Sequence, residues 1–484
     1  MGALPDGFGL ALDRSLRRFR AGTVLAGGHP GRVVTLTAAG ASALDALVAG
    51  GTPDAATADL AGRLVRSGMA HPRPPAQVAG GRPATIPTVT GRPATLPTVT
   101  VVVPVRDRVG ALDRCLASVG TDVPVVVVDD GSSDPDAVAA LCARRGARLV
   151  VRTVNGGPAA ARNDAVAAVT TDVVAFLDSD CTVRPGWLDG LLWHFADPEV
   201  AAVAPRIRPV DPPSGPSARA VDRFGRAHSP LDLGPDEGEV GPGRAVRYVP
   251  TAALLVRREA LVAVGGFDTA LRVGEDVDLV WRLGAAGWRV RYDPSVSVRH
   301  DEPRRWIDLL VRRFRYGTSA GPLARRHPGL LAPVELRPWP TAAALAVLLG
   351  APGSAAVLTA AATAYLARRV RPLGIPPGQA AAWSAQGTGW TVVGLGRAAT
   401  MLAAPGLVLL ATRGRRGARA AALLTVVPPV VEWWRTRPGL DLPRWVVASV
   451  ADDAAYGAGV WTGCLRARSF GPLLPRSGRG AGES

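Results

Sequence analysis

Residues 173–180 read VVAFLDSD, a run of apolar residues that ends in two carboxylates. The β-branched and aromatic side chains predict a buried strand, and Asp178 and Asp180 follow where that strand ends. On an extended strand, residues two apart point to the same face. Carboxylates at the carboxyl end of a parallel strand lie where open α/β sheets bind their ligands. Two such groups suit a hard divalent cation that in turn holds a diphosphate.

The same kind of pattern continues upstream of this stretch. Three continuous Val-rich runs predict parallel strands covered on both faces: TVTVVVPV (98–105), VPVVVVDD (123–130) and ARLVVRT (147–153). Helical segments fall between these runs, among them ALDRCLASV (111–119) and AVAALCARRG (137–146). The alternation predicts a doubly wound α/β domain with a mostly parallel sheet over residues 98–302.

Polar groups gather where the predicted strands end. Asp129 and Asp130 precede a Gly-Ser turn, where carboxylates can hydrogen-bond the base and ribose of a nucleoside or simply cap the turn. The turn Asn155-Gly-Gly-Pro opens a helix that carries Arg162. The free N–H groups of such a helix start, together with a guanidinium, form a natural place for negative charge. An ordinary helix start has the same sequence character.

A second acidic group begins a predicted helix further along the chain. Glu275, Asp276 and Asp278 lie in GEDVDLVWRL (274–283), where acidic residues often only complement the helix dipole. A carboxylate there that faced a sugar's anomeric carbon could instead deprotonate an incoming hydroxyl. His300 follows a short alternating strand, and a histidine near a metal–diphosphate site is a reasonable additional ligand.

Taken in order, these segments resemble the family 2 glycosyltransferases of GT-A fold. The matching pieces are VVVPVRDR, VVVVDDGSSD, NGGPAAARN, FLDSD and GGFDTALRVGEDVDLVWRL, which together cover residues 98–302. The resemblance implies a hexosyltransferase that uses a nucleotide-sugar donor and inverts the anomeric carbon. The Q-x-x-R-W motif of processive synthases is missing, and the nearest segment is RRFRYG (312–317). Long processive synthesis is therefore not expected, while the synthesis of short oligomers stays open.

The same resemblance implies a role for each candidate residue. Asp276 would be the catalytic base, and Asp180 with His300 would bind Mg²⁺ or Mn²⁺. The remaining residues would bind the donor: Asp107, Asp129 and Asp130 at the nucleoside, and Asp178 and Arg162 at the diphosphate.

Residues 1–75 predict a small separate domain. LRRFRAGTVLAGGHPGRVVTLT (16–37) contains two short strand-like runs around a Gly-rich turn. Helical periodicity follows in AAGASALDALVAG (38–50) and ATADLAGRLVRSGMAHP (56–72). This arrangement is similar to the winged-helix peptide-recognition modules of ribosomal peptide biosynthesis.

Two segments predict flexible chain. Residues 76–97 read as a Pro-rich linker, because GRPATIPTVT (81–90) is followed by the near copy GRPATLPTVT (91–100). A repeat copied once is typical of an insertion in a tolerant linker. Residues 466–484 read as a flexible tail.

Residues 303–465 are both basic and apolar. The chain contains no Lys, and the net charge of +16 resides after residue 302. The uncharged run WPTAAALAVLLGAPGSAAVLTAAATAYLA (339–367) is long enough to cross a bilayer, although Pro352 and Gly353 interrupt it. Basic clusters beside apolar helices suit the cytoplasmic face of an anionic membrane. A soluble, Ala-rich helical subdomain is the alternative.

The cysteines and the N-terminus favour the cytoplasmic side of that membrane for the bulk of the chain. Asp6 and Asp13 lie where a signal peptide would need an apolar core. The four cysteines are scattered without a C-x-x-C motif, which indicates neither a zinc site nor a disulfide framework: Cys115, Cys142, Cys181 and Cys464.

The order of the three regions suggests an acceptor. A winged-helix-like module, a transferase domain and a basic apolar end together resemble the glycosyltransferases of the mycofactocin system in actinobacteria. The resemblance implies that glucose from UDP-glucose is added, in β-1,4-linked steps, to a small redox cofactor cut from a peptide. One alternative is a membrane glycosyltransferase that acts on a polyprenyl phosphate or a cell-envelope glycan.

A second alternative is a binding protein whose catalytic fold is a relict. The candidate carboxylates argue against a relict because the set is intact: Asp130, Asp178, Asp180 and Asp276. The balanced charge of residues 1–75 argues against a nucleic-acid partner, which usually requires a basic face.

Overall fold

A computed structural model describes residues 4–5, 7–74, 86–87, 93–94, 97–211 and 219–478. The chain divides into two compact units, Met1–Val210 with Pro230–Asp301, and Asp211–Ser229 with Glu302–Ser484. The first unit contains the N-terminal module and the α/β domain. The second contains the apolar, Arg-rich helices.

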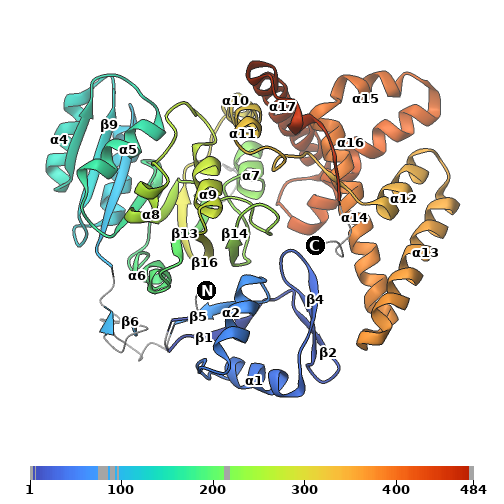
Figure 1. The fold of residues 1–484 in the computed structure, drawn as a ribbon. Helices are drawn as coiled ribbons and strands as arrows, with labels where there is room; N and C mark the ends of the chain where they lie inside the picture. The colour runs from blue at the N-terminus through green and yellow to red at the C-terminus, as the bar shows by residue number, and fades with distance from the viewer. Residues whose placement is uncertain are drawn as a thin grey trace. The chain divides into compact units, whose positions relative to one another are not determined.

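A nine-stranded sheet forms the centre of the α/β domain. Its first half has the order β10-β9-β8-β11 with every neighbouring pair parallel. These strands are β8 (Val99–Val105), β9 (Val125–Asp130), β10 (Arg148–Arg152) and β11 (Val173–Leu177). Three helices connect them, with α4 and α5 beside β9 in Figure 1: α3 (Val109–Val119), α4 (Pro135–Arg145) and α5 (Pro158–Ala168).

The second half of the sheet is mixed rather than mainly parallel. The order continues β15-β13-β16-β12, and only β13 and β16 run parallel. Its strands are β12 (Cys181–Thr182), β13 (Val200–Pro209), β14 (Gly238–Val240), β15 (Ala253–Arg257) and β16 (Arg289–His300). The helical segments of this half are α6 (Asp189–Leu192), η1 (Trp193–Ala196), α8 (Arg258–Ala263) and α9 (Glu275–Ala285). The predicted α/β fold is confirmed, with this antiparallel share as an addition.

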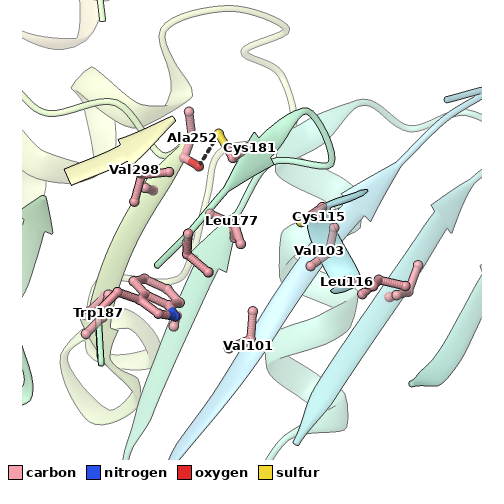
Figure 2. Packing of buried hydrophobic residues seen from close by; sticks show 14 of the residues in the cluster. Val101, Val103, Cys115, Leu116, Leu177, Cys181, Trp187, Ala252 and Val298 are labelled. Atoms are coloured by element: carbon pink, nitrogen blue, oxygen red, sulfur yellow. Dashed lines mark hydrogen bonds between the residues drawn. The ribbon is translucent and has the colours of Figure 1, made fainter. Parts of the chain in front are cut away.

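Strand β11 is buried on both faces, as its apolar run predicts. Val173, Ala175 and Leu177 point into the main hydrophobic core, part of which Figure 2 shows around Leu177 and Trp187. On the opposite face, the ring of Phe176 meets Phe267 edge to face, with centroids 5.2 Å apart.

The N-terminal module contains more strands than the sequence predicts. Its two helices, α1 (Ala38–Val48) and α2 (Ala58–Arg66), lie where the periodicity places them. Strands β2 (Arg17–Phe19), β3 (Val24–Gly27) and β4 (Arg32–Thr35) form an antiparallel sheet, and β1 (Gly9–Leu12) pairs with β5 (Ala70–Arg73). Buried side chains including Phe8, Leu25, Leu44 and Met69 form its core.

The predicted linker falls mostly outside the described residues. Of residues 76–97, the structure describes 86–87, 93–94 and 97. The two short segments pair as β6 (Ile86–Pro87) and β7 (Pro93–Ala94), so the remainder of the tandem repeat stays a prediction.

The second unit consists mainly of helices. They are α7 (Ala220–Ala227), α10 (Trp306–Gly317), α11 (Ala320–Arg326), α12 (Pro338–Leu348), α13 (Pro352–Val370), α14 (Pro377–Leu402), α15 (Ala404–Ala411), α16 (Gly414–Thr436) and α17 (Leu442–Ala467). Three short elements accompany them: η2 (Arg371–Leu373), η3 (Gly471–Leu473) and the β17–β18 pair (Glu335–Leu336 with Arg476–Ser477). The predicted tail thus contains the end of α17, η3 and β18, while residues 479–484 lie outside the description.

Close helix packing in this unit depends on glycine. At Gly317 of α10, an added Cβ would collide with the backbone oxygen of Tyr456 on α17, and at Gly459 it would collide with Phe314. Only residues without a side chain allow the two backbones to approach this closely.

The long apolar run is divided between two helices. Helix α12 ends at Leu348 and α13 begins at Pro352, which matches the interruption seen in the sequence. Among the described residues, no individual helix is both long enough and apolar enough to cross a membrane. Only α14 and α15 taken together meet that requirement, and they are bent by 99° where they join.

Candidate active site

Asp178 and Asp180 lie in a turn directly after β11. The strand ends at Leu177, and Cys181 N–H donates to the Asp178 carbonyl over 2.9 Å, so the two acids are not successive same-face residues of a strand. Asp178 Oδ1 accepts from Arg162 Nη2 at 2.9 Å. Asp180 contacts Arg108 through one oxygen and lies 3.6 Å from His300 Nε2 through the other. The turn therefore presents each carboxylate to a different basic partner.

Arg162 joins three elements of the domain from a buried position on α5. Only 3% of the residue is exposed, and Nη1 donates to Glu275 Oε1 at 2.8 Å while Nη2 reaches Asp178. Its guanidinium also lies over the ring of Phe267, 5.6 Å from the centroid. Burial alone would lower the pKa of Arg162, but the charges of Asp178 and Glu275 outweigh it and raise the pKa. The guanidinium thus orients both carboxylates, and its contact with a diphosphate stays a prediction.

Asp130 closes the glycine turn that follows β10. Asp130 Oδ1 accepts from Gly156 N–H at 2.8 Å and from Arg152 Nε at 2.9 Å, and Oδ2 accepts from Gly157 N–H at 2.8 Å. The negative charge that the sequence predicts at this helix start is thus the protein's own. Both carboxylate oxygens of Asp130 thus already accept hydrogen bonds from the protein. The contact of Asp130 with the nucleoside stays a prediction.

Asp107 and Asp129 brace the neighbouring loops. Asp107 has a φ of 59°, and its Oδ1 accepts from the backbone N–H and the hydroxyl of Ser133 at 2.6 and 2.8 Å. These two hydrogen bonds lower the pKa of Asp107. Asp129 is fully buried and accepts from Ser132 N–H at 3.0 Å, which is the turn-capping arrangement. Of the predicted nucleoside ligands, Asp107 is the most accessible to solvent.

The start of α9 contains three carboxylates, two of which form ion pairs. Gly274, at a φ of 84°, precedes the helix, Glu275 pairs with Arg162, and Asp278 pairs with Arg282 at 2.7 Å. None of the ion pairs between described residues involves Asp276. Burial raises the pKa of Asp276 to about 7, and the negative charge of Glu275 adds to the effect. A carboxylate that titrates near neutrality suits general base catalysis.

His300 reaches the same edge from the end of β16. It is the register partner of Cys181, so the strand pairing places it beside Asp180. Burial raises the pKa of Asp180, the charge of His300 opposes this, and the charge of Asp178 adds to it. Two hard carboxylate oxygens beside an imidazole nitrogen suit Mg²⁺ or Mn²⁺.

These donors form only part of a metal shell. The described residues include no cluster of three or more His, Cys, Asp or Glu arranged as a complete metal site. Mg²⁺ is commonly held by one or two carboxylates with substrate phosphates and water supplying the rest. The donor set therefore fits a cation that arrives with a diphosphate.

Several cations at this edge escaped the sequence reasoning. Arg108 holds Asp180, Arg152 holds Asp130, and Arg272 donates to Asn155 Oδ1 at 3.1 Å beside the glycine turn. Arg108 lies within the quoted motif VVVPVRDR, which was the available signal. Arg272 likewise lies within the quoted motif GGFDTALRVGEDVDLVWRL, whereas Arg152 lies in none of the family motifs.

The arrangement brings two groups of predicted residues to one sheet edge. Asp107, Asp129 and Asp130 brace the loops after β8, β9 and β10. The second group connects the ends of β11, α9 and β16 and consists of Asp178, Asp180, Glu275, Asp276, Arg162 and His300. At this edge, the carboxylate of Asp276, with a pKa of about 7, can accept a proton, and the acidic turn with His300 can hold a metal–diphosphate.

Comparison with known proteins shows which family the chain belongs to. Residues 100–261 match the family described as glycosyl transferase family 2. The chain is 39% identical over 500 residues to the pre-mycofactocin glycosyltransferases of two Mycobacterium tuberculosis strains, with 98% of each chain covered.

More distant relatives share only part of the chain. It is 34% identical over 222 residues to an N-acetylglucosaminyl-diphospho-decaprenol L-rhamnosyltransferase of M. tuberculosis, covering 39% of this chain and 71% of that protein. Among solved structures, a mannosyltransferase from Pyrobaculum calidifontis in complex with GDP-Man and Mn²⁺ is 21% identical. It has a TM-score of 0.42 and covers 74% of this chain and 87% of that one.

Proposed function

The chain belongs to the family 2 glycosyltransferases, within the group of the pre-mycofactocin glycosyltransferases, and from this premise we propose its reaction. The enzyme transfers glucose from UDP-glucose, with inversion of the anomeric carbon, to a hydroxyl of the peptide-derived redox cofactor of the mycofactocin system. The full-length similarity, which includes the N-terminal module and the helical unit, is the observation that carries this proposal.

Asp276 accepts the proton in this mechanism. The acceptor hydroxyl attacks the anomeric carbon as its proton passes to the carboxylate of Asp276, a C–O bond forms, and the bond to the diphosphate breaks on the opposite face. A base whose pKa lies at about 7 is about half ionised at neutral pH and basic enough to accept a proton. Base catalysis of this kind contributes about 10²–10⁴-fold.

The neighbouring residues organise the donor. Asp180 and His300, with Asp178 beside them, are the groups that would hold Mg²⁺ or Mn²⁺. When bound, the cation supplies positive charge at the departing diphosphate. Arg162 orients Asp178 and Glu275 by donating a hydrogen bond to each, and Arg272 is an exposed cation at the same edge.

The helical unit associates with the cytoplasmic face of a membrane in this proposal. Each large aromatic side chain that is exposed among the described residues lies in this unit: Trp306, Trp339, Tyr365, Trp390, Trp434, Trp461 and Phe470. Exposed arginines accompany them, including Arg413, Arg415, Arg416 and Arg419. Aromatic rings favour the membrane interface, and arginines favour anionic lipid headgroups.

Vesicle binding tests this association. We expect the full chain to bind vesicles containing anionic phospholipid, and to release as salt is raised. Replacing Arg415, Arg416 and Arg419 by Gln should weaken binding about 100-fold, because each arginine near such a surface contributes about 1 kcal/mol. Arg144→Gln, on α4 of the other unit, is the matched control. Equal binding to neutral vesicles would contradict the proposal.

A polyprenyl phosphate or cell-envelope glycan is the second candidate acceptor. The exposed apolar surface of the helical unit favours it, since such acceptors reside in membranes. Purified enzyme incubated with UDP-glucose, a divalent cation and either acceptor class would decide between them. Hexose on the peptide-derived cofactor, with inverted configuration by NMR, supports the first proposal. Transfer only to the lipid-linked acceptor supports the second.

A further inference from the structure

A cavity of about 490 Å³ lies between the N-terminal module and the α/β domain, apart from the catalytic edge. Both of its walls belong to the first compact unit. Its volume is within the range of about 300–1,000 Å³ that is usual for small-molecule sites. Its lining from the module includes Asp13, Arg14 and Arg73, and its lining from the domain includes Trp193, Asp236 and Asp293.

Specific contacts hold the two walls together. Arg73 Nη1 donates to Glu237 Oε2 at 2.9 Å, and Arg244 donates to the backbone oxygens of His29 and Arg66 at 2.8 and 2.7 Å. The ring of Trp193 packs against Phe8 of the module core, 5.8 Å between centroids. The cavity is therefore a built feature of the interface.

The charges on the cavity wall are already matched within the protein. Each charged lining residue has an ionic or hydrogen-bonding partner in the protein: Arg14 pairs with Asp236 at 3.5 Å and Arg73 with Glu237, while the carboxylates of Asp13 and Asp293 each lie 2.9 Å from the Nε2 atom of a histidine, His71 and His194 respectively. A charged ligand would have to displace one of these pairs. A neutral ligand that offers many hydrogen-bonding groups would not.

The same wall retains hydrogen-bonding capacity. Burial alone would raise the pKa of Asp13 and of Asp293, but the hydrogen bonds from His71 and His194 hold both at about 2. Both carboxylates are therefore ionised. Asp13 Oδ1 also accepts from Ser15 and Asp293 Oδ1 from the backbone N–H of Ser295, and each Oδ2, which accepts from a histidine, has a further lone pair. Trp193 and the adjacent prolines supply apolar surface beside these acceptors.

We propose that this cavity binds carbohydrate, specifically the neutral sugars already attached to the acceptor. A sugar ring combines hydroxyl groups, which need donors and acceptors, with a C–H face that packs on an aromatic ring. The carboxylates and arginines of the cavity provide the polar contacts, and Trp193 with the lining prolines provides apolar surface beside them. The Trp193 ring already stacks on His194, 3.5 Å between centroids, so its contribution is apolar surface and not a free ring face. This proposal rests on the proposed function, since it assigns the cavity to the product of earlier transfers.

Strand β16 connects the cavity to the catalytic edge. Asp293 lines the cavity, and His300 lies seven residues further along the same strand. At about 3.3 Å per residue, the two positions are at most about 23 Å apart along the strand. A single sugar cannot cover that distance, whereas a short chain of sugars can. Binding the distal sugars raises the effective concentration of the acceptor end and favours further addition.

Direct binding of an oligosaccharide tests this proposal. The full chain, without donor or peptide-derived acceptor, is titrated with cellotetraose by calorimetry and by saturation-transfer NMR. We expect binding to wild type and about tenfold weaker binding to Asp236→Ala, with Arg14→Ala as a second variant. Both side chains are largely exposed, at 73% and 81%, so the fold should tolerate their loss. Asp59→Ala, whose carboxylate is 72% exposed on α2, is the control.

Each outcome bears on the proposal. Weaker binding in the cavity variants together with a loss of the longer products would support it. No binding of cellotetraose to wild type, equal binding to all variants, or binding of a charged peptide in its place would overturn it. The titration contains no transfer step, so a failure of the proposed transfer reaction would be seen separately.

Discussion

Asp276→Asn tests the base assignment because the substitution removes the ionisable group and little else. Asn is nearly isosteric, and its oxygen can still accept the 2.8 Å hydrogen bond from Val277 N–H. We expect kcat to fall about 10²–10⁴-fold, the usual share of general base catalysis. Metal-dependent binding of UDP should be retained, since Asp180 and His300 are unaltered. Asp59→Asn, on the surface of α2, is the matched control.

The pH dependence follows from the same carboxylate. Because the base must be ionised, wild-type kcat should fall as pH decreases through about 7, the pKa of Asp276. The variant should lose this limb of the profile. The assay is a radiometric or mass-spectrometric rate measurement between pH 5 and 9, with UDP binding followed by calorimetry at each pH.

Stability should change in the opposite direction. Because the pKa of Asp276 is raised from 3.8 to about 7, the folded state loses stability as pH rises from about 4 to about 7, and the loss is complete above pH 7. A shift of about three units corresponds to about 4 kcal/mol, and partial exposure of the side chain reduces the expected effect to about 2 kcal/mol. Asp276→Asn should therefore unfold at a higher temperature than wild type at pH 8, and the difference should shrink as pH falls and disappear below about pH 4, where the carboxyl group is protonated in both states. Near-normal turnover in the variant would refute the base assignment.

Three further predictions concern the buried arginine Arg162, the buried histidine His228 and the metal. Arg162→Met leaves the buried carboxylate of Glu275 and the partly exposed carboxylate of Asp178 without their cation and should destabilise the α/β domain by about 3 kcal/mol, seen as a lower midpoint of chemical denaturation. An unchanged midpoint would show that the ion pairs contribute little. Burial alone would lower the pKa of His228, but the hydrogen bonds that its ring donates to Asp452 and Glu432 raise it to about 9, so wild type should lose stability as pH rises through 9, and His228→Gln should not. Chelation should abolish transfer reversibly, and Asp180→Asn should require more Mn²⁺ for half-maximal rate; insensitivity to both would remove the metal from the mechanism.

The sequence predicts the strand ends because each buried strand finishes in a polar group. Val-rich runs predict β8, β9 and β11; β9 ends in Asp129 and Asp130, and Asp178 follows β11 directly. The sequence does not predict the direction of β15, because a short apolar run has the same composition in either direction. The antiparallel half of the sheet therefore emerged only from the structure.

The partners of the acidic residues were harder to predict than their positions. Glu275 meets Arg162 across 113 positions of sequence, and Asp130 binds the backbone of a turn 26 residues away. Such pairings depend on how helices pack on the sheet, which no local pattern encodes. The interruption of the apolar run was predictable, since proline favours the first turn of a helix, and Pro352 begins α13.

Mass spectrometry of small molecules from a host with and without this gene tests the central proposal most directly. The proposed function predicts that a ladder of species spaced by hexose, built on a small redox-active molecule, disappears when the gene is deleted and returns with the wild-type gene. The Asp276→Asn gene should fail to restore it. An unchanged ladder together with altered lipid-linked sugars would contradict the assignment of the cofactor as acceptor.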